Sequence, residues 1–112
     1  MKIYHNPRCR KSRETLALIT AKEEDVEVIE YLNTPPTKTE LTHILKLLGI
    51  PAQDLIRKSE PIYKEKFKGK SITDDEWVSI MVEYPKLIER PIVLKGNKAI
   101  IGRPPENVLE LL

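Results

Sequence analysis

The sequence predicts an α/β protein with a mixed sheet, because three blocks of different pattern follow one another. Residues 2–31 alternate strand, helix and strand; about residues 36–86 show only helical periodicity; residues 90–112 hold two short strands and a helix. Elements in this order form a sheet with helices on its faces. The chain has 112 residues, which fits one domain. We therefore expect a single domain over 1–112, with a core from residues 1–35 and 87–112 and an all-helical insertion at about 36–86.

The first block has the pattern of a βαβ unit. Residues 2–5 are a short apolar strand, and apolar spacing after Pro7 indicates a helix that ends near Lys22. A polar break at 23–25 precedes a β-branched strand at 26–31. Because both connections are short, the two strands should be parallel with a right-handed crossover.

The middle block predicts helices from the residues at their ends. Two capping boxes, in which a threonine and a glutamate three positions later satisfy each other's backbone N–H groups, are formed by Thr37 with Glu40 and Thr73 with Glu76. Gly49 is the expected end of the first of these helices, and Pro85 follows the second. Shorter helices are expected after Pro51 and around Tyr63 and Phe67.

The last block predicts a hairpin and a terminal helix. Residues 90–94 and 98–101 are apolar strands on either side of the turn residues Lys95-Gly96-Asn97. Pro104-Pro105-Glu106 then starts a helix, because proline is well tolerated in a first helical turn.

The chemistry of the chain centres on Cys9, its only cysteine, which lies between the first strand and the first helix. The neighbouring basic residues are Arg8, Arg10, Lys11 and Arg13. A thiol reacts as its thiolate, and both a helix N-terminus and nearby cations lower the thiol pKa. The same backbone N–H groups favour a docked anion. The pattern therefore predicts that Cys9 is a nucleophile beside an oxyanion site; the competing interpretation is an inert, buried apolar cysteine.

Two polar residues flank this cysteine. His5 stands four residues before Cys9, and Ser12 stands three residues after it, on the same side of the predicted helix. We expect His5 to be an ion-pair or hydrogen-bond partner of the sulfur and the Ser12 hydroxyl to donate to it. The Cys-x-x-Ser spacing permits no internal disulfide, so a catalytic Cys9 needs a resolving thiol from elsewhere.

Three arginines, Arg57, Arg90 and Arg103, each stand at the edge of an element beside an apolar run. The planar guanidinium offers a fork of donors that suits tetrahedral oxyanions. The alternative is three unrelated surface arginines, which is the usual place of this residue.

Composition excludes several classes of protein. The net charge of +2 is too small to indicate nucleic-acid binding. One cysteine forms no structural disulfide, which suits a reducing compartment, and no apolar run reaches membrane-spanning length. The chain has one cysteine and two histidines, His5 and His43, that are far apart in the sequence, so it lacks the spacing of a metal-ligand motif. We expect a cytoplasmic protein without a bound metal.

Several of these motifs together resemble the glutaredoxin-linked, thioredoxin-fold arsenate reductases over essentially the whole chain. The resemblance rests on His5-Asn6-Pro7-x-Cys9-x-x-Ser12-Arg13, Leu55-Ile56-Arg57-Lys58, Arg90-Pro91-Ile92-Val93 and Arg103-Pro104. It implies a thioredoxin-like fold with a four-stranded mixed sheet and a cis Arg90–Pro91 bond. It also implies that Cys9 attacks arsenate, that His5 and Ser12 lower the thiol pKa, and that the three arginines hold the oxyanion.

By the same resemblance, glutathione is the co-substrate, glutaredoxin is a protein partner, and no cofactor is bound. We expect a monomer. Two alternatives remain: an Spx-type regulator that binds RNA polymerase, against which the Cys-x-x-Ser spacing argues, and a general glutathione-linked thiol oxidoreductase. A phosphatase-like arsenate reductase needs Cys-x5-Arg, and here that position is Thr15.

Overall fold

A computed structural model describes residues 1–22 and 25–112, so most of the predicted break at 23–25 lies outside the described residues. The described chain forms two compact units. The first, here called the sheet unit, consists of Met1–Thr34 and Arg90–Leu112. The second, the helical unit, is the continuous segment Pro35–Glu89.

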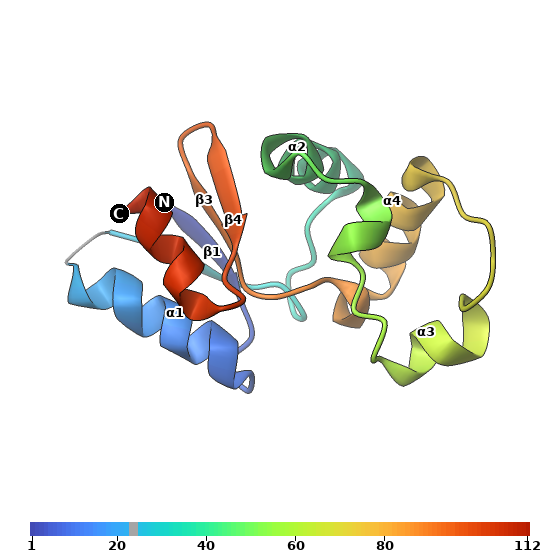
Figure 1. Cartoon of the computed structure of the whole chain (residues 1–112), viewed down its shortest axis with the longest axis horizontal. Coiled ribbons are helices and arrows are strands. Elements are labelled where there is room, and N and C mark those ends of the chain that lie inside the picture. Colours follow the sequence, from blue (N-terminus) through green and yellow to red (C-terminus); the bar gives the residue numbers. More distant parts are fainter. Residues whose placement is uncertain (23–24) are drawn as a thin grey trace. The chain divides into compact units, whose positions relative to one another are not determined.

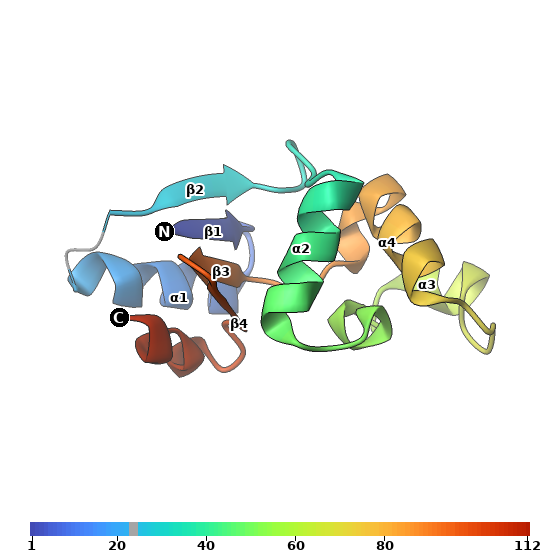
Figure 2. The ribbon, with the colours of Figure 1, turned by 90° about the horizontal axis from the view of Figure 1, so that it is seen from above.

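The sheet unit is built on a four-stranded mixed sheet in the order β2-β1-β3-β4 (Figure 2). Its strands are β1 (Lys2–His5), β2 (Glu27–Glu30), β3 (Ile92–Lys95) and β4 (Lys98–Ile101). As predicted, β1 runs parallel to β2. It is an inner strand, because it pairs on its other side with antiparallel β3. This arrangement confirms the predicted α/β class with a mixed sheet.

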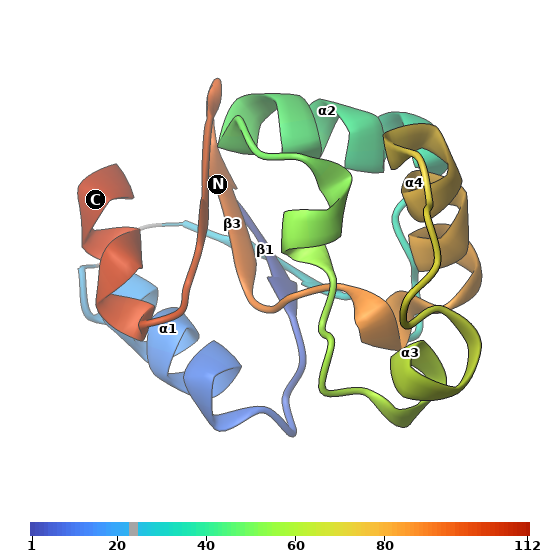
Figure 3. The same cartoon turned by 45° about the vertical axis from the view of Figure 1, so that its right-hand side comes forward.

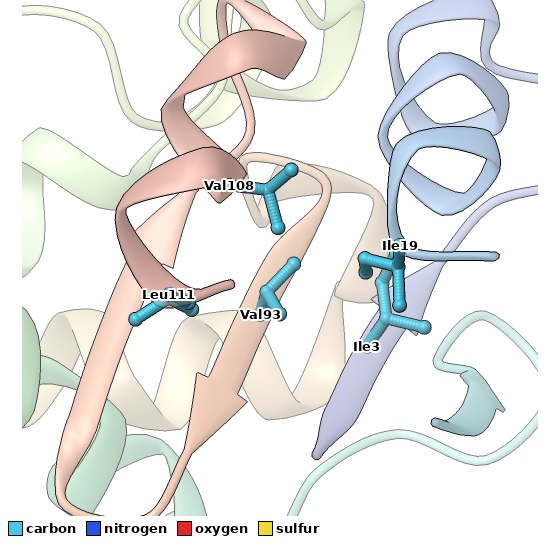
Figure 4. Close-up of a cluster of buried hydrophobic side chains, with 5 residues drawn as sticks. All are labelled: Ile3, Ile19, Val93, Val108 and Leu111. Carbon is cyan, nitrogen blue, oxygen red and sulfur yellow. The ribbon is translucent and has the colours of Figure 1, made fainter. Parts of the chain in front are cut away.

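Two helices cover one face of this sheet, namely α1 (Arg10–Ala21) and the 3₁₀ helix η3 (Pro105–Leu111), which lie side by side (Figure 1). Between them and the sheet lies a buried apolar cluster made of Ile3, Ile19, Val93, Val108 and Leu111 (Figure 4). Burying one such side chain stabilises a fold by about 1.5–3 kcal/mol. This cluster therefore fixes α1, whose N-cap residue is Cys9, to β1 and β3.

The helical unit contains three α-helices and two 3₁₀ helices (Figure 3). They are α2 (Lys38–Leu48), η1 (Ala52–Leu55), α3 (Pro61–Lys66), α4 (Asp74–Glu83) and η2 (Pro85–Leu87). Both predicted capping boxes are present: the Thr37 hydroxyl accepts from the Glu40 N–H at 3.1 Å, and Thr73 does the same for Glu76 at 3.2 Å. Gly49 ends α2 in the left-handed conformation, with φ of 67°.

The two predicted anchors of the short helix α3 both pack on Trp77 of α4. The ring centroids of Tyr63 and Trp77 are 6.3 Å apart, and those of Phe67 and Trp77 are 5.8 Å apart. Aromatic pairs at these distances add to the stabilisation that burial gives.

Several element boundaries differ from the prediction. The strand expected at 26–31 ends at Glu30, because its carbonyl accepts the N–H groups of Asn33 and Thr34 and the chain turns. The strand expected from residue 90 begins at Ile92, since Pro91 has no N–H to donate to a ladder. The helices expected after Pro51 and at the C-terminus are 3₁₀ helices. None of the helices among the described residues is long and apolar enough to cross a bilayer.

Candidate active site

A tight turn after β1 places Cys9 at the N-cap of α1. The Cys9 N–H donates to the Asn6 carbonyl at 3.0 Å, and the Arg8 N–H donates to the Asn6 side-chain oxygen at 3.0 Å. The Cys9 carbonyl accepts from the Arg13 N–H at 3.0 Å, which is the first bond of the helix. The thiol is half-buried and stands where unpaired helical N–H groups favour a negative charge.

Opposing effects act on the pKa of the Cys9 thiol, and the net result lies below the ordinary value. Burial raises this pKa and is the largest single effect. The Ser12 backbone N–H, the charge and hydrogen bond of Arg90, and a hydrogen bond from Arg103 lower it and together prevail. The Arg103 Nη1 atom lies 3.8 Å from the Cys9 Sγ atom. The sulfur is therefore biased toward the thiolate, the nucleophilic form.

The Ser12 hydroxyl is engaged away from the sulfur, which corrects its predicted contact. Its Oγ lies 2.6 Å from the His5 Nδ1 atom and accepts from the Asn6 N–H at 3.0 Å. Ser12 is fully buried, and His5 is nearly so. Ser12 therefore acts on Cys9 through its backbone N–H, while its side chain ties the end of β1 to the first turn of α1.

The surroundings of His5 favour its neutral form. Burial lowers the pKa of the imidazole most; the carboxylate of Glu30 raises it and the Arg13 guanidinium lowers it, with a net decrease. His5 pairs with Glu30 across the β1–β2 ladder. A neutral imidazole is a hydrogen-bond partner for Ser12 rather than a cation for the thiolate.

Arg90 and Arg103 lie on the two proline turns of the sheet unit and converge on Cys9. Both Arg90–Pro91, as predicted, and Arg103–Pro104 are cis. Burial lowers the pKa of Arg90, but its contacts with Cys9 and Tyr31 raise it, and the net shift is upward. Arg103 Nη1 also donates to the Arg90 carbonyl at 3.2 Å, so the two arginines are linked.

Tyr31 is a site residue that sequence reasoning missed. It follows β2 directly, it is fully buried, and it lies near enough to Arg90 to raise the pKa of that guanidinium. An aromatic residue at the end of a strand is ordinarily a packing residue. Only the folded arrangement shows that its polar end belongs to the site.

Arg57, the third predicted arginine, belongs to the helical unit. Its Nε lies 3.6 Å from a Glu60 carboxylate oxygen, and its Nη1 lies 3.8 Å from one of Glu89. The Arg57 N–H donates to the Leu87 carbonyl at 2.7 Å, which fixes the backbone beside these carboxylates. Its role toward Cys9 stays a prediction.

The arrangement in the sheet unit offers a thiol with a lowered pKa and two guanidinium groups beside its sulfur atom. Such a set attacks an electrophile while donors hold the charge that develops on its oxygens. Within residues 1–22 and 25–112, no cluster of three or more His, Cys, Asp or Glu side chains is placed to hold a metal ion.

Comparison with known proteins gives consistent matches along the whole chain. The family model described as the ArsC family matches residues 4–111. The chain is 48% identical to the uncharacterized protein YfgD of Escherichia coli, covering 100% of this chain and 96% of that protein. It is 44% identical to an arsenate reductase of Haemophilus influenzae, over 98% and 97% of the two chains. A solved arsenate reductase from Vibrio cholerae has a TM-score of 0.94 at 47% identity, over 100% and 98%.

Proposed function

Because the chain belongs to the ArsC family, we propose that it is an arsenate reductase that converts arsenate to arsenite through the thiolate of Cys9. The observation that carries this proposal is the position of the Cys9 sulfur at the N-cap of α1, in contact with Arg90 and Arg103. Relatives at 40% and 44% identity, matched over nearly their whole length, bear the name arsenate reductase.

In the proposed mechanism, arsenate first docks over the start of α1. The guanidinium groups of Arg90 and Arg103 donate to its oxygens, with Arg57 proposed as a third ligand. The helical N–H groups add a favourable field for the dianion. These donors remain in place as charge redistributes, so they stabilise the transition state as well as the bound substrate.

Chemistry then begins with attack of the Cys9 thiolate on arsenic. The S–As bond forms, an As–O bond breaks, and the oxygen leaves as water after taking up protons from solvent. The product is a covalent thiol–arsenate adduct in which arsenic is still arsenic(V). The Ser12 N–H and the His5–Ser12–Asn6 network hold the sulfur-bearing turn during this step.

We propose glutathione as the reductant, with glutaredoxin as the protein that clears the resulting mixed disulfide. The chain has one cysteine, so the second thiol that a two-electron reduction requires comes from another molecule. A reducing, cytoplasmic setting follows from this proposal because both thiols must stay reduced. No bound cofactor takes part in the scheme.

The test is arsenate-dependent NADPH oxidation with glutathione, glutaredoxin and glutathione reductase supplied. We expect wild type to be active and Cys9→Ser to lose at least about 10³-fold in kcat, because the nucleophile is gone. Lys22→Ala, an exposed cation at the other end of α1, is the control and should keep wild-type activity. A folded Cys9→Ser protein with wild-type activity, or an inactive wild type with a reactive thiol, would overturn the proposal.

A further inference from the structure

A cleft of about 390 Å³ lies beside the loop that carries Cys9, wholly within the sheet unit. One wall is the turn before α1 and the other is the turn after β2; the lining residues are His5, Asn6, Pro7, Arg8, Glu30, Leu32 and Asn33. Its volume falls within the usual range of small-molecule sites. Neither Arg90 nor Arg103 lines it, so it is distinct from the proposed oxyanion site.

Backbone hydrogen bonds hold both walls of this cleft. On one side, the Asn6 carbonyl and side-chain oxygen accept the N–H groups of Cys9 and Arg8. On the other side, the Glu30 carbonyl accepts the N–H groups of Asn33 and Thr34 at 2.9 and 3.0 Å. Walls fixed in this way favour binding, because little conformational freedom is lost when a ligand enters.

The cleft presents one positive and one negative side chain. Arg8 belongs to the Cys9 loop and Glu30 ends β2. Within the two ranges that the structure describes, the side chains of Arg8 and Glu30 form no ion pair with any residue. Leu32, which is 38% exposed, and Asn33, which offers a side-chain amide, also line the cleft. A ligand that matches this lining has a carboxylate, an ammonium group and a short apolar or amide middle.

We propose that this cleft binds the reducing thiol as a zwitterionic peptide, with Arg8 receiving a carboxylate and Glu30 receiving the ammonium group. The inference rests on the proposed function and adds to it a recognition site for the second substrate. Arg8 directly precedes Cys9 in the chain, so a peptide held in the cleft lies beside the loop that carries the nucleophile. Glutathione has all three features, namely carboxylates, an α-ammonium group and an amide-linked middle, and its middle residue carries the thiol.

The step served by this site balances in atoms and electrons. The glutathione thiolate attacks the Cys9 sulfur of the thiol–arsenate adduct, forms the S–S bond and breaks the S–As bond. The electron pair of that bond leaves with arsenic, which becomes arsenic(III) and takes three protons from solvent as arsenous acid. The two thiols are thereby oxidised to a mixed disulfide, which a further thiol molecule reduces through glutaredoxin.

Steady-state kinetics with two matched pairs of variants tests the site. We expect Arg8→Ala and Glu30→Gln each to raise KM for glutathione about three- to five-fold, the scale of an exposed charge pair, with KM for arsenate unchanged. The controls are Arg10→Ala, one position beyond Cys9, and Glu27→Gln, at the other end of β2. Both should keep the wild-type KM for glutathione and for arsenate. With glutathione ethyl ester, whose glycyl carboxylate is blocked, or a neutral thiol such as 2-mercaptoethanol, the Arg8→Ala effect should disappear.

A binding experiment separates this inference from the proposed function. S-methylglutathione keeps both charged ends but does not react, so titrating it into the ¹⁵N-labelled protein needs no arsenate. We expect saturable shifts of the Leu32 and Asn33 amides that weaken in Arg8→Ala and Glu30→Gln. If these shifts occur but wild type reduces no arsenate, the function fails and the site stands. If arsenate is reduced while the two variants match their controls in KM and in binding, the cleft is not the thiol site.

Discussion

The reactivity of Cys9 depends on a balance in which no single neighbour decides the outcome. Burial alone raises the pKa of the thiol, and only the combined effect of the Ser12 N–H, Arg90 and Arg103 reverses this. One of these donors is backbone and two are side chains from distant positions in the sequence. The lowered thiol pKa is therefore a property of the folded sheet unit, and the same cysteine in an unfolded chain has an ordinary thiol pKa.

His5 makes the stability of the protein depend on pH. Because its folded pKa is lowered, chiefly by burial, the unfolded chain binds a proton that the folded chain refuses. The free energy of unfolding should thus fall as the pH decreases below about 6.5, and this contribution should level off below the folded-state pKa. In His5→Asn, the free energy of unfolding should decrease less between about pH 7.5 and pH 5.5 than it does in wild type.

Urea unfolding followed by circular dichroism at the two pH values measures this difference. The chain contains one other histidine, His43, whose side chain is exposed on α2. His43→Asn is therefore the matched control and should retain the wild-type pH dependence. An equal change in both variants would show that His5 is not the group responsible.

At the scale of elements, the site depends on how closely the end of β4 approaches α1 and the Pro91 turn. The Gly102 N–H donates to the Pro91 carbonyl at 2.8 Å, and Thr15 of α1 is buried beside it. A Cβ atom at Gly102 would lie 2.6 Å from the Thr15 Oγ1 atom and 2.8 Å from the Pro91 Cγ atom. Glycine is thus required there by space, and the next residue is Arg103.

Gly102→Ala should therefore destabilise the protein by about 1–3 kcal/mol and slow the reaction of Cys9 with iodoacetamide at neutral pH. The loss of stability comes from overpacking, and the slower alkylation comes from displacement of Arg103. Gly49→Ala is the comparison: it has a φ of +67° but nothing within 4 Å of its Cβ position. That variant should lower the free energy of unfolding by about 1 kcal/mol and leave the rate of Cys9 alkylation unchanged. Equal alkylation rates in the two variants would contradict the role given to Gly102.

At the scale of the whole molecule, Arg57 of the helical unit is proposed as a further ligand of the oxyanion. We expect Arg57→Ala to reduce kcat/KM for arsenate about 10²-fold, the usual effect of removing one preorganised donor to an oxyanion. Lys58→Ala, which removes the neighbouring exposed cation, should change kcat/KM for arsenate little. Thermal unfolding of both variants shows whether the fold is retained, because Arg57→Ala also removes a cation from beside Glu60 and Glu89. Equal kcat/KM in the two folded variants would exclude Arg57 from the site.

Much of the fold could be predicted from the sequence because its signals are local. Capping boxes at Thr37 and Thr73, the turn at Gly96 and the parallel βαβ pattern each depend on a few neighbouring residues. The length of β2 and the 3₁₀ form of the last helix could not be predicted, because they depend on turns and packing from other parts of the chain.

For the candidate site, the sequence indicated which residues to consider but not the contacts that they make. The spacing of Cys9 and Ser12 indicated that the two residues lie close together. It did not indicate that His5 and Asn6 hydrogen-bond to the Ser12 hydroxyl, which leaves the Ser12 backbone N–H as the group that acts on the sulfur. Tyr31 beside Arg90, and the carboxylates beside Arg57, join residues through tertiary structure alone. Hydrogen-bond partners of this kind follow from the fold and have no signal in local sequence.

The strand order has a consequence for synthesis on the ribosome. β1 lies between β2 and β3, and β3 begins only at Ile92, after the whole helical unit. The helical unit is continuous in sequence, so it can form while the chain is still growing. The first strand, in contrast, keeps one edge unpaired until nearly the entire polypeptide has emerged. During translation that edge is open to pairing with another nascent chain.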